Sequence, residues 1–159
     1  MSFRIGQGID FHQLAEGRAF WLGGVQIPHH KGCIGHSDAD VLLHAICDAL
    51  LGAVGLGDIG KHFPDTDEAY KGIDSKVLLR RSYNMVRERG FWLVNIDSTI
   101  LLQEPKIKPY ISQMQEAISR IVHLSPEDVS IKATTTEQMS FVGREEGVVA
   151  LANVLIQKY

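Results

Sequence analysis

The chain has 159 residues, of which 45% are hydrophobic and 22% charged, as expected for one globular domain with a substantial core. Its 16 Lys and Arg residues and 19 Asp and Glu residues give a formal net charge of −3. No strongly basic run occurs, which argues against nucleic acid as a partner. We therefore expect a single domain over residues 1–159 that does not bind nucleic acid.

The cysteine pattern and the apolar runs bear on location. Cys33 and Cys47 form no C-x-x-C pair, so neither a zinc ribbon nor a disulfide framework is expected. The first residues resemble neither a signal peptide nor a transit peptide. No apolar run approaches the roughly 18 residues of a membrane span. These features predict a cytoplasmic protein that does not contact a membrane.

The first elements are a strand and a hairpin. Residues 3–10 predict a strand. Gly23-Gly24 lies between two short apolar segments, Ala19–Leu22 and Val25–Ile27, and this arrangement predicts a hairpin with a two-residue turn.

A helix is predicted from Ser37 to about Val54. Ser37 is a good N-cap, and Asp40 stands three residues later as its capping-box partner. A stripe at helical spacing is expected to be buried: Leu43, Ile46, Leu50 and Val54. Asp40, His44 and Asp48 follow one another at four-residue intervals on a different stripe. Such polar residues are unusual in so apolar a segment, which makes His44 a candidate functional residue.

The rest of the chain mixes helices and strands. The expected elements are a glycine-rich loop over 55–67, helices over 75–89 and from Pro109 to about His123, a capped turn over 125–128, and strands over 91–103, 129–133 and 148–156. The final strand is apolar on both faces, which suggests that it is buried on both sides, with another subunit as a candidate cover. Together the elements predict an α+β domain, with a mixed β-sheet and helices packed on one face.

Asp10 and His12 are the first candidate metal ligands. Residues i and i+2 of a strand point to the same face, so these two side chains would project together. His44 could complete the set from the helix. Two nitrogens and a carboxylate oxygen suit zinc, and three protein ligands leave a fourth position open for substrate. Spacing alone also allows a strand-end Asp beside two ordinary histidines.

Three further segments carry polar groups suited to anions. Residues 55–60 match G-x-G-x-x-G, but a helix precedes them, so we favour a helix C-cap and turn with Asp58 at its tip. His36 and Ser37 lie at a helix N-terminus, where free N–H groups favour an anion, although Ser37 could serve only as a cap. Residues 133–137 offer hydroxyls and a carboxylate that suit a phosphate and a divalent cation, or else form an ordinary polar loop.

Short motifs occur in a fixed order along nearly the whole chain: Gly8–His12, His36–Val41, His44, Gly57–Gly60, Phe63–Asp67, Lys132–Glu137 and Gly143–Arg144. Each motif is weak alone, but the ordered set resembles the 2-C-methyl-D-erythritol 2,4-cyclodiphosphate synthase family. The length matches the stand-alone enzyme and leaves no room for the cytidylyltransferase domain fused to it in some bacteria.

The resemblance implies a phosphorus–oxygen lyase of the non-mevalonate isoprenoid pathway. Such an enzyme converts 4-diphosphocytidyl-2-C-methyl-D-erythritol 2-phosphate into the 2,4-cyclodiphosphate and CMP. The nucleophile is the 2-phosphate of the substrate, which attacks the β-phosphate and is already anionic because its second pKa is about 6. Positioning and metal electrostatics are then the main contributions expected of the protein.

The resemblance also assigns roles to residues. It implies Zn²⁺, or another divalent transition metal, at Asp10, His12 and His44, and a Mg²⁺ or Mn²⁺ held by Glu137 across the substrate diphosphate. The implied substrate contacts are His36, Ser37 and Asp58 at the methylerythritol phosphate, Gly60 and Asp65 nearby, Thr135 at the diphosphate, and Leu102–Lys108 with Ala133 and Thr134 around the cytidine, Lys106 among them. His36, Thr135 and Glu137 are the residues expected to be catalytic. From its position alone, one turn beyond His44, we infer that Asp48 is a hydrogen-bond partner of a ligand histidine.

A homotrimer is implied as well, with the sheets facing the three-fold axis and each active site between neighbours. Phe141 and Arg144 match residues that line a central cavity holding an isoprenoid diphosphate. Some members carry an acidic residue where this chain has Leu151, so the polarity of the cavity and its ligand stay open.

Two other classes of function stay open. A metal-dependent phosphohydrolase would use the same three ligands with a zinc-bound water as nucleophile, and its linear monophosphate product would distinguish it. A non-catalytic zinc-binding assembly would bind metal without turnover. The loop from Thr134 to Glu137 and the glycine-rich segment argue against the second class, since a structural site needs neither.

Overall fold

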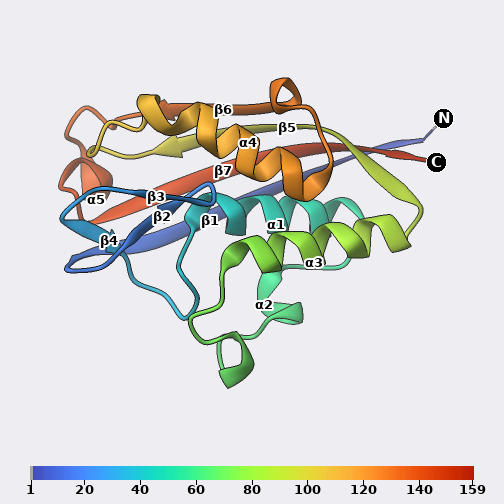
Figure 1. Cartoon of the computed structure of the whole chain (residues 1–159), viewed down its shortest axis with the longest axis horizontal. Coiled ribbons are helices and arrows are strands. Elements are labelled where there is room, and N and C mark those ends of the chain that lie inside the picture. Colours follow the sequence, from blue (N-terminus) through green and yellow to red (C-terminus); the bar gives the residue numbers. More distant parts are fainter. Residues whose placement is uncertain (1) are drawn as a thin grey trace.

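In the computed structural model, which describes residues 2–159, long helices cover one face of a five-stranded sheet (Figure 1). The strands, in spatial order, are β4 (Lys31–Cys33), β1 (Phe3–Glu16), β7 (Gly147–Lys158), β5 (Phe91–Leu101) and β6 (Val129–Thr134). The long helices are α1 (Val41–Ala53), α3 (Ser75–Glu88) and α4 (Ile111–Val122). Only the β5–β6 pair of this sheet is parallel. The predicted α+β class, mixed sheet and one-sided helical layer are confirmed.

The smaller elements lie at the edges of this layered core. Strands β2 (Phe20–Leu22) and β3 (Val25–Ile27) form the predicted hairpin, and both turn glycines, Gly23 and Gly24, have positive φ angles of 61° and 79°. The short helices and 3₁₀ turns are α2 (Ile59–His62), α5 (Ser140–Gly143), η1 (Glu68–Tyr70), η2 (Lys108–Tyr110) and η3 (Pro126–Asp128). Within the described residues, no helix has the length and apolar character that crossing a membrane requires.

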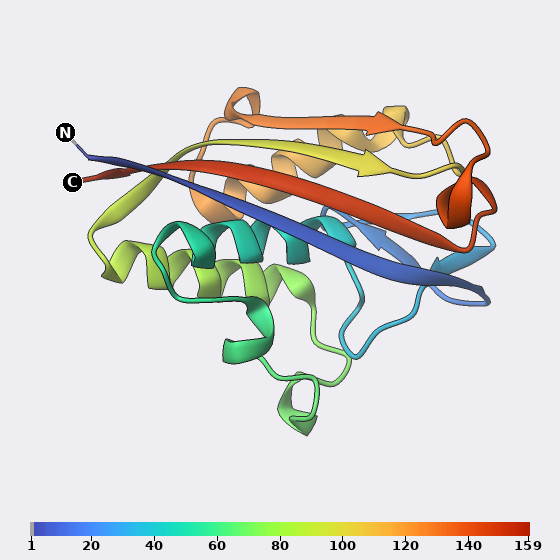
Figure 2. The ribbon, with the colours of Figure 1, turned by 180° about the vertical axis from the view of Figure 1, so that it is seen from behind.

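Strand β1 is longer than the predicted 3–10 segment. It pairs with β7 from Phe3 opposite Gln157 to Gln13 opposite Gly147, and its last residues pair with β4. Figure 2 shows β1 and β7 running side by side along the molecule, with both termini at one end. Asp10 and His12 therefore lie inside a continuous ladder rather than at a strand end. Their polar side chains do not interrupt it because the ladder uses backbone groups.

The N-cap of α1 is Asp40, so the predicted N-cap Ser37 is wrong. The Asp40 carboxylate accepts hydrogen bonds from the N–H groups of Leu43 at 3.1 Å, Gly23 at 2.9 Å and Gly24 at 2.7 Å. Asp40 is fully buried, and these donors satisfy a carboxylate that would otherwise be costly to bury. The tertiary contact with the hairpin turn, which local sequence does not reveal, thus selects the cap.

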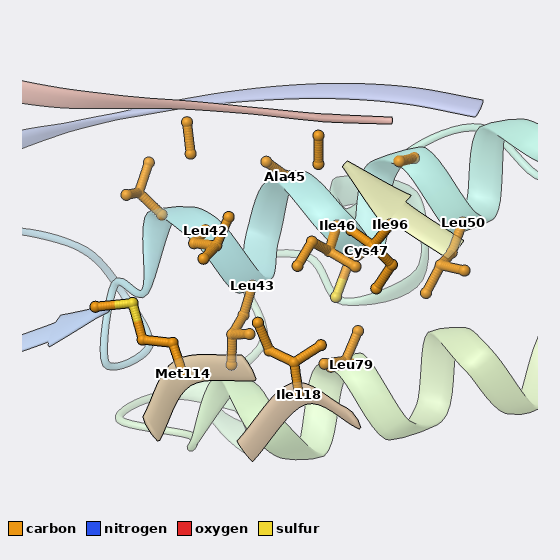
Figure 3. Packing of buried hydrophobic residues seen from close by; sticks show 14 of the residues in the cluster. Leu42, Leu43, Ala45, Ile46, Cys47, Leu50, Leu79, Ile96, Met114 and Ile118 are labelled. Atoms are coloured by element: carbon orange, nitrogen blue, oxygen red, sulfur yellow. The ribbon is translucent and has the colours of Figure 1, made fainter. Parts of the chain in front are cut away.

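Helix α1 is buried on nearly all sides. The predicted stripe of Leu43, Ile46, Leu50 and Val54 is buried, and the opposite side of the helix packs against β1 and β7. Figure 3 shows α1 between the sheet and the helices beyond it, with Leu43 directed toward Met114 of α4. Packing on both sides fixes the position of α1 relative to β1, and this relation places His44 beside Asp10 and His12.

The sheet face away from the helices is apolar along β1 and largely uncovered there. Its large exposed side chains on β1 are Phe3, Ile5, Ile9 and Phe11, and Ile5 is 81% exposed. Leu151 of β7 is opposite Ile9 and half-buried on the same face. The other face of β7 is buried under the helices, as predicted. Full burial of the second face would require another molecule, since of the apolar side chains that β7 places there only Val149 is buried within residues 2–159.

Candidate metal and substrate site

The three predicted metal ligands come together in the fold. Nε2 of His12 lies 2.9 Å from Oδ2 of Asp10, and Nδ1 of His44 lies 3.1 Å from the same oxygen. The two histidine nitrogens are 3.2 Å apart. Asp10 and His12 share one face of β1, as the strand periodicity predicted, and His44 reaches them from the first turns of α1.

This triangle fits a small divalent metal ion. Zinc bonds of about 2.0–2.1 Å in a tetrahedron place neighbouring ligand atoms about 3.3–3.4 Å apart. The observed separations of 2.9–3.2 Å are only slightly shorter. Two imidazoles and one carboxylate are a donor set that suits zinc, and three ligands leave a coordination position for a bound molecule.

Hydrogen bonds on the far side of each ring fix which nitrogen faces the metal. Nδ1 of His12 donates to the backbone carbonyl of Ile34 at 3.0 Å, which leaves Nε2 free as a ligand. Nε2 of His44 lies 2.9 Å from the hydroxyl of Ser75 and 3.1 Å from that of Ser37, which leaves Nδ1 free. Such bonds orient ligand histidines and set their tautomer.

The inference that Asp48 holds a ligand histidine is wrong. Oδ1 of Asp48 accepts a hydrogen bond from the N–H of Ile59 at 2.7 Å, so Asp48 anchors the start of α2. Ser75 occupies the role that we had expected of Asp48. Sequence analysis missed Ser75 because its partner His44 is 31 residues away, and the only local feature of Ser75 is its place at the start of a helix.

The charges in the triangle are coupled. Burial raises the pKa of Asp10, but its hydrogen bonds with His12 and His44 outweigh burial and lower that pKa to about 2. Burial lowers the pKa of His12, whereas its hydrogen bond with Asp10 and the Ile34 carbonyl raise it above the ordinary value. A metal ion that replaces the proton on His12 would take over its role of compensating the Asp10 charge.

A cavity of about 380 Å³ opens beside the triangle. The predicted site residues that line it are His12, His36, Ser37, His44, Gly60 and Asp65. Nε2 of His36 lies 3.0 Å from the backbone oxygen of Asp67, which holds the ring at the cavity wall. Asp58 is not among the lining residues. It is the exposed N-cap of α2, accepting from the N–H of Lys61 at 3.0 Å, and its substrate role stays a prediction.

A second, smaller cavity of about 160 Å³ lies at the other edge of the sheet. Thr135, predicted at the diphosphate, lines it together with most of the residues predicted around the cytidine, namely Leu102, Pro105, Lys106, Ile107, Lys108, Ala133 and Thr134. Glu137 follows in the same loop with a positive φ of 53°, and its N–H donates to the Thr135 hydroxyl at 3.2 Å. The exposed Glu137 carboxylate is therefore free to meet a cation, but the fold of one chain does not bring it into the lining of either cavity.

Phe141 and Arg144 lie apart from both cavities, on and just after α5. The Phe141 ring packs against Phe11 with centroids 6.2 Å apart, at the end of the uncovered sheet face. Arg144 is exposed, and its Nε donates to Glu146 at 2.8 Å. Their predicted contact with an isoprenoid diphosphate is not tested by the fold of one chain.

Comparison with known sequences identifies the family. Residues 3–157 match the sequence model of the YgbB family. The chain belongs to the YgbB family. It is 58% identical over 156 residues to the 2-C-methyl-D-erythritol 2,4-cyclodiphosphate synthase of Geobacillus sp. (strain WCH70), covering 98% of this chain and 99% of that protein. It is also 58% identical over 155 residues to the synthase of Shouchella clausii, covering 98% of each.

Solved structures of similar proteins share the fold. The bifunctional IspDF of Campylobacter jejuni superposes with a TM-score of 0.96 at 44% identity, and the match covers 99% of this chain but 43% of that longer protein. A 2C-methyl-D-erythritol-2,4-cyclodiphosphate synthase described as a CDP-bound form superposes with a TM-score of 0.90 at 39% identity, covering 97% of this chain and all of that one. The predicted family resemblance is thus confirmed over essentially the whole sequence.

Proposed function

We propose that this YgbB-family protein converts 4-diphosphocytidyl-2-C-methyl-D-erythritol 2-phosphate into 2-C-methyl-D-erythritol 2,4-cyclodiphosphate and CMP. The observation that carries the proposal is the ligand triangle of Asp10, His12 and His44, which opens onto a cavity without a cysteine or lysine in its lining. The full-length similarity to proteins of that name supports the same reaction.

The cavity residues suit an intramolecular attack. His36, Ser37 and the backbone at Gly60 surround the space next to the ligands, where they would hold the methylerythritol phosphate. The 2-phosphate needs no side-chain base, because it is already charged near neutral pH. A divalent ion bound by the triangle supplies positive charge that offsets the growing charge on the β-phosphate. The protein's main task is to fold the substrate so that its two phosphate groups meet.

Zinc is the ion that we propose for the triangle, and Mg²⁺ or Mn²⁺ the ion for Glu137. The donor set of the triangle supports zinc. A single exposed carboxylate that binds a cation together with phosphate oxygens suits Mg²⁺ or Mn²⁺, which are harder cations. The nucleotide end of the substrate would occupy the second cavity, with Lys106 at its rim and Thr134 and Thr135 along its wall. The CDP-bound relative supports a cytidine diphosphate ligand.

We further propose a homotrimer whose active sites lie between subunits. Asp10, Ala150, Ile100 and Ala133 form one row across β1, β7, β5 and β6. Three strand spacings of about 4.8 Å put Asp10 and Ala133 roughly 14 Å apart. The two cavities also share no lining residue. The nucleotide cavity of a neighbouring subunit could lie closer to the metal than the one in the same chain.

The uncovered sheet face is a second, independent observation that supports the trimer. Exposed Phe3, Ile5, Ile9 and Phe11 form an apolar surface of a kind that monomers rarely leave in water. Three such faces turned to a common axis would cover one another and leave a cavity near Phe141, Arg144 and Leu151. An isoprenoid diphosphate there, and a cytoplasmic location for the protein, remain our predictions. The free and buried Cys33 and Cys47 are consistent with a reducing compartment.

A phosphorus NMR time course with the proposed substrate tests the function. We expect two coupled phosphorus signals of a cyclic diphosphate to appear together with that of CMP. A substrate without the 2-phosphate should not be cyclised, and no phosphorylated or nucleotidylated side chain should be trapped during turnover. A linear monophosphate as product would instead support the phosphohydrolase. No feature of the site specifically favours that reaction.

A further inference from the structure

We propose that Ser75 is a positioning residue for the metal site, acting through a hydrogen-bonded link from Asp38 through Ser75 to His44. We call these three residues the serine link. The inference deepens the proposed function, because it rests on a metal ion held by Asp10, His12 and His44. It names a residue outside the cavity that controls how tightly and in what geometry the ion is held.

The first hydrogen bond of the link to consider is the one at the ring of His44. When Nδ1 of His44 faces a metal ion, Nε2 carries the proton and can only donate. The Ser75 hydroxyl lies 2.9 Å from Nε2 and can accept that hydrogen bond. The Ser75 hydroxyl in turn donates to Oδ1 of Asp38, and the Ser75 N–H donates to Oδ2 of Asp38 at 3.1 Å. Both carboxylate oxygens of Asp38 therefore accept hydrogen bonds from Ser75. Because the hydroxyl proton is used in this way, the lone pairs of the hydroxyl oxygen are directed toward the imidazole.

Ser75 lies in a buried part of the fold. It is fully buried at the first turn of α3 and lines none of the cavities beside it. Two backbone hydrogen bonds join the loop before α1 to the segment before α3, from Gly72 N to His36 O at 2.7 Å and from Asp38 N to Ile73 O at 3.1 Å. The two ends of the serine link thus come from segments that are fastened to each other.

Ser37 is the alternative acceptor, and its setting differs. Its hydroxyl is 3.1 Å from Nε2 of His44 and accepts from the N–H of Ala39 at 3.1 Å, and Ser37 lines the cavity beside the metal ligands. A hydroxyl at the cavity wall is available to a bound molecule, and it has no carboxylate to orient it. Ser75 has a half-buried carboxylate partner, Asp38, and is itself fully buried with no access to ligand. The geometry therefore assigns the orientation of His44 to Ser75 and leaves Ser37 free for substrate.

The test is the zinc affinity of purified variants, measured by competition with a chelator. Ser75→Ala should weaken zinc binding by about 10–100-fold, the usual effect of removing a hydrogen-bond partner of a metal ligand. Asp38→Asn should cause a smaller loss in the same direction, and Ser75→Thr, which keeps the hydroxyl, should bind zinc more tightly than Ser75→Ala. With Co²⁺ in place of zinc, the visible absorption bands of Ser75→Ala should shift, because the imidazole is no longer held.

The chain offers a matched control. Ser82 lies on the same helix, is equally buried, and its hydroxyl oxygen has no hydrogen-bond partner among the described residues. Ser82→Ala should change zinc affinity by less than about twofold. Wild-type zinc affinity and an unchanged Co²⁺ spectrum in Ser75→Ala would overturn the proposal, as would a loss confined to Ser37→Ala. If Ser75→Ala does not fold, wild-type affinity in Asp38→Asn would overturn it.

The outcomes also separate this proposal from the proposed function. Weaker zinc binding in Ser75→Ala without any cyclic product from the wild-type protein would support the serine link and contradict the reaction. Cyclic product from the wild type with unchanged zinc affinity in Ser75→Ala would support the reaction and contradict the serine link.

Discussion

Gly8 of β1 lies directly against the backbone carbonyl of Ala45 in α1. A Cβ atom on Gly8 would come within 1.9 Å of that oxygen, far inside van der Waals contact. Gly6 has the same relation to Ala49, at 1.8 Å. Because Gly8 precedes Asp10 by two residues on the same face of β1, and Ala45 follows His44, this contact sets the separation of the metal ligands.

We predict that Gly8→Ala destabilises the fold and disrupts the metal site together. The new methyl group meets backbone, which cannot move aside as a side chain would, so α1 must shift away from β1. The free energy of unfolding should fall by about 3 kcal/mol or more, and zinc content should fall with it. Thermal unfolding and metal analysis measure the two effects.

Gly52→Ala is the control for this substitution. Gly52 lies in α1, and a Cβ atom there would meet nothing within 4 Å, so alanine at this position should leave zinc content unchanged. It should stabilise the helix by about 0.5–1 kcal/mol, since glycine is a poor helix former. Full zinc occupancy in Gly8→Ala would show that the close approach of β1 and α1 does not control the site.

A second prediction concerns the ligands themselves. The wild-type protein should purify with about one zinc ion per chain, and His44→Ala should lose the ion and the activity while staying folded. His44 is partly exposed to the cavity, so its removal leaves space that water can fill. The partly exposed His29, which lines neither of the two cavities, should keep both zinc and activity when it is substituted by Ala. Full zinc occupancy in His44→Ala would contradict the ligand assignment.

The third prediction concerns pH. In the metal-free protein the pKa of His12 is above its ordinary value of 6.5, and that of Asp10 is about 2. Zinc must displace the His12 proton, so zinc affinity should fall by up to about tenfold per pH unit once pH drops below the raised pKa. Asp10 stays ionised above about pH 3 and adds nothing to this dependence. Chelator competition between pH 5.5 and 8 measures the slope.

The same group gives the metal-free protein the opposite trend. A histidine whose folded pKa exceeds its unfolded value adds stability that is fully present below the unfolded pKa and is lost as pH rises through the folded pKa. The contribution of His12 to the free energy of unfolding should therefore decrease with rising pH without zinc. The stabilisation by zinc should increase with rising pH over the same range. Parallel trends in the two forms would show that His12 is not the group that zinc deprotonates.

The sequence predicted elements whose signals are local. The Gly23-Gly24 turn, the end of α3 before Gly90 and the alternation that puts Asp10 and His12 on one face all follow from short-range rules, and the structure confirms them. Strand β4 and helix α5 were not predicted. Each is only three or four residues long, and β4 exists because it pairs with the end of β1. Such segments take their conformation from partners far away in sequence.

The same limit applies to the site: features set by local sequence were predictable, and features set by distant contacts were not. Its ligands follow from residue type and spacing, but the choice of Asp40 as N-cap depends on the hairpin turn, and the role of Ser75 depends on α3 packing beside α1. A further limit is that the predicted substrate residues line two separate cavities of one chain. His36, Ser37 and Asp65 line one cavity and Lys106 and Thr135 the other, so joining them into one site is a question of quaternary structure.

The last prediction tests that quaternary arrangement. In a closed three-fold ring each contact is heterologous, so one subunit would give its metal face while its neighbour gives the nucleotide loop. His44→Ala damages the first side of the site and Lys106→Glu the second, and each variant alone should be inactive. The two variants are then unfolded and refolded together. In some of the mixed trimers, the intact metal face of a Lys106→Glu subunit should lie against the intact nucleotide loop of a His44→Ala subunit and so complete one site. Activity should then reappear.

The matched control is a pair of variants with damage on the same side. His44→Ala refolded with Asp10→Asn leaves every metal face defective, so no mixture of these subunits can form an intact site, and activity should stay at the level of the parents. Mass spectrometry of the refolded mixtures shows whether subunits have exchanged. Exchange between His44→Ala and Lys106→Glu subunits without any gain in activity would contradict a site shared between subunits. A gain in that pair alone would place the metal and the nucleotide loop of each working site on different chains.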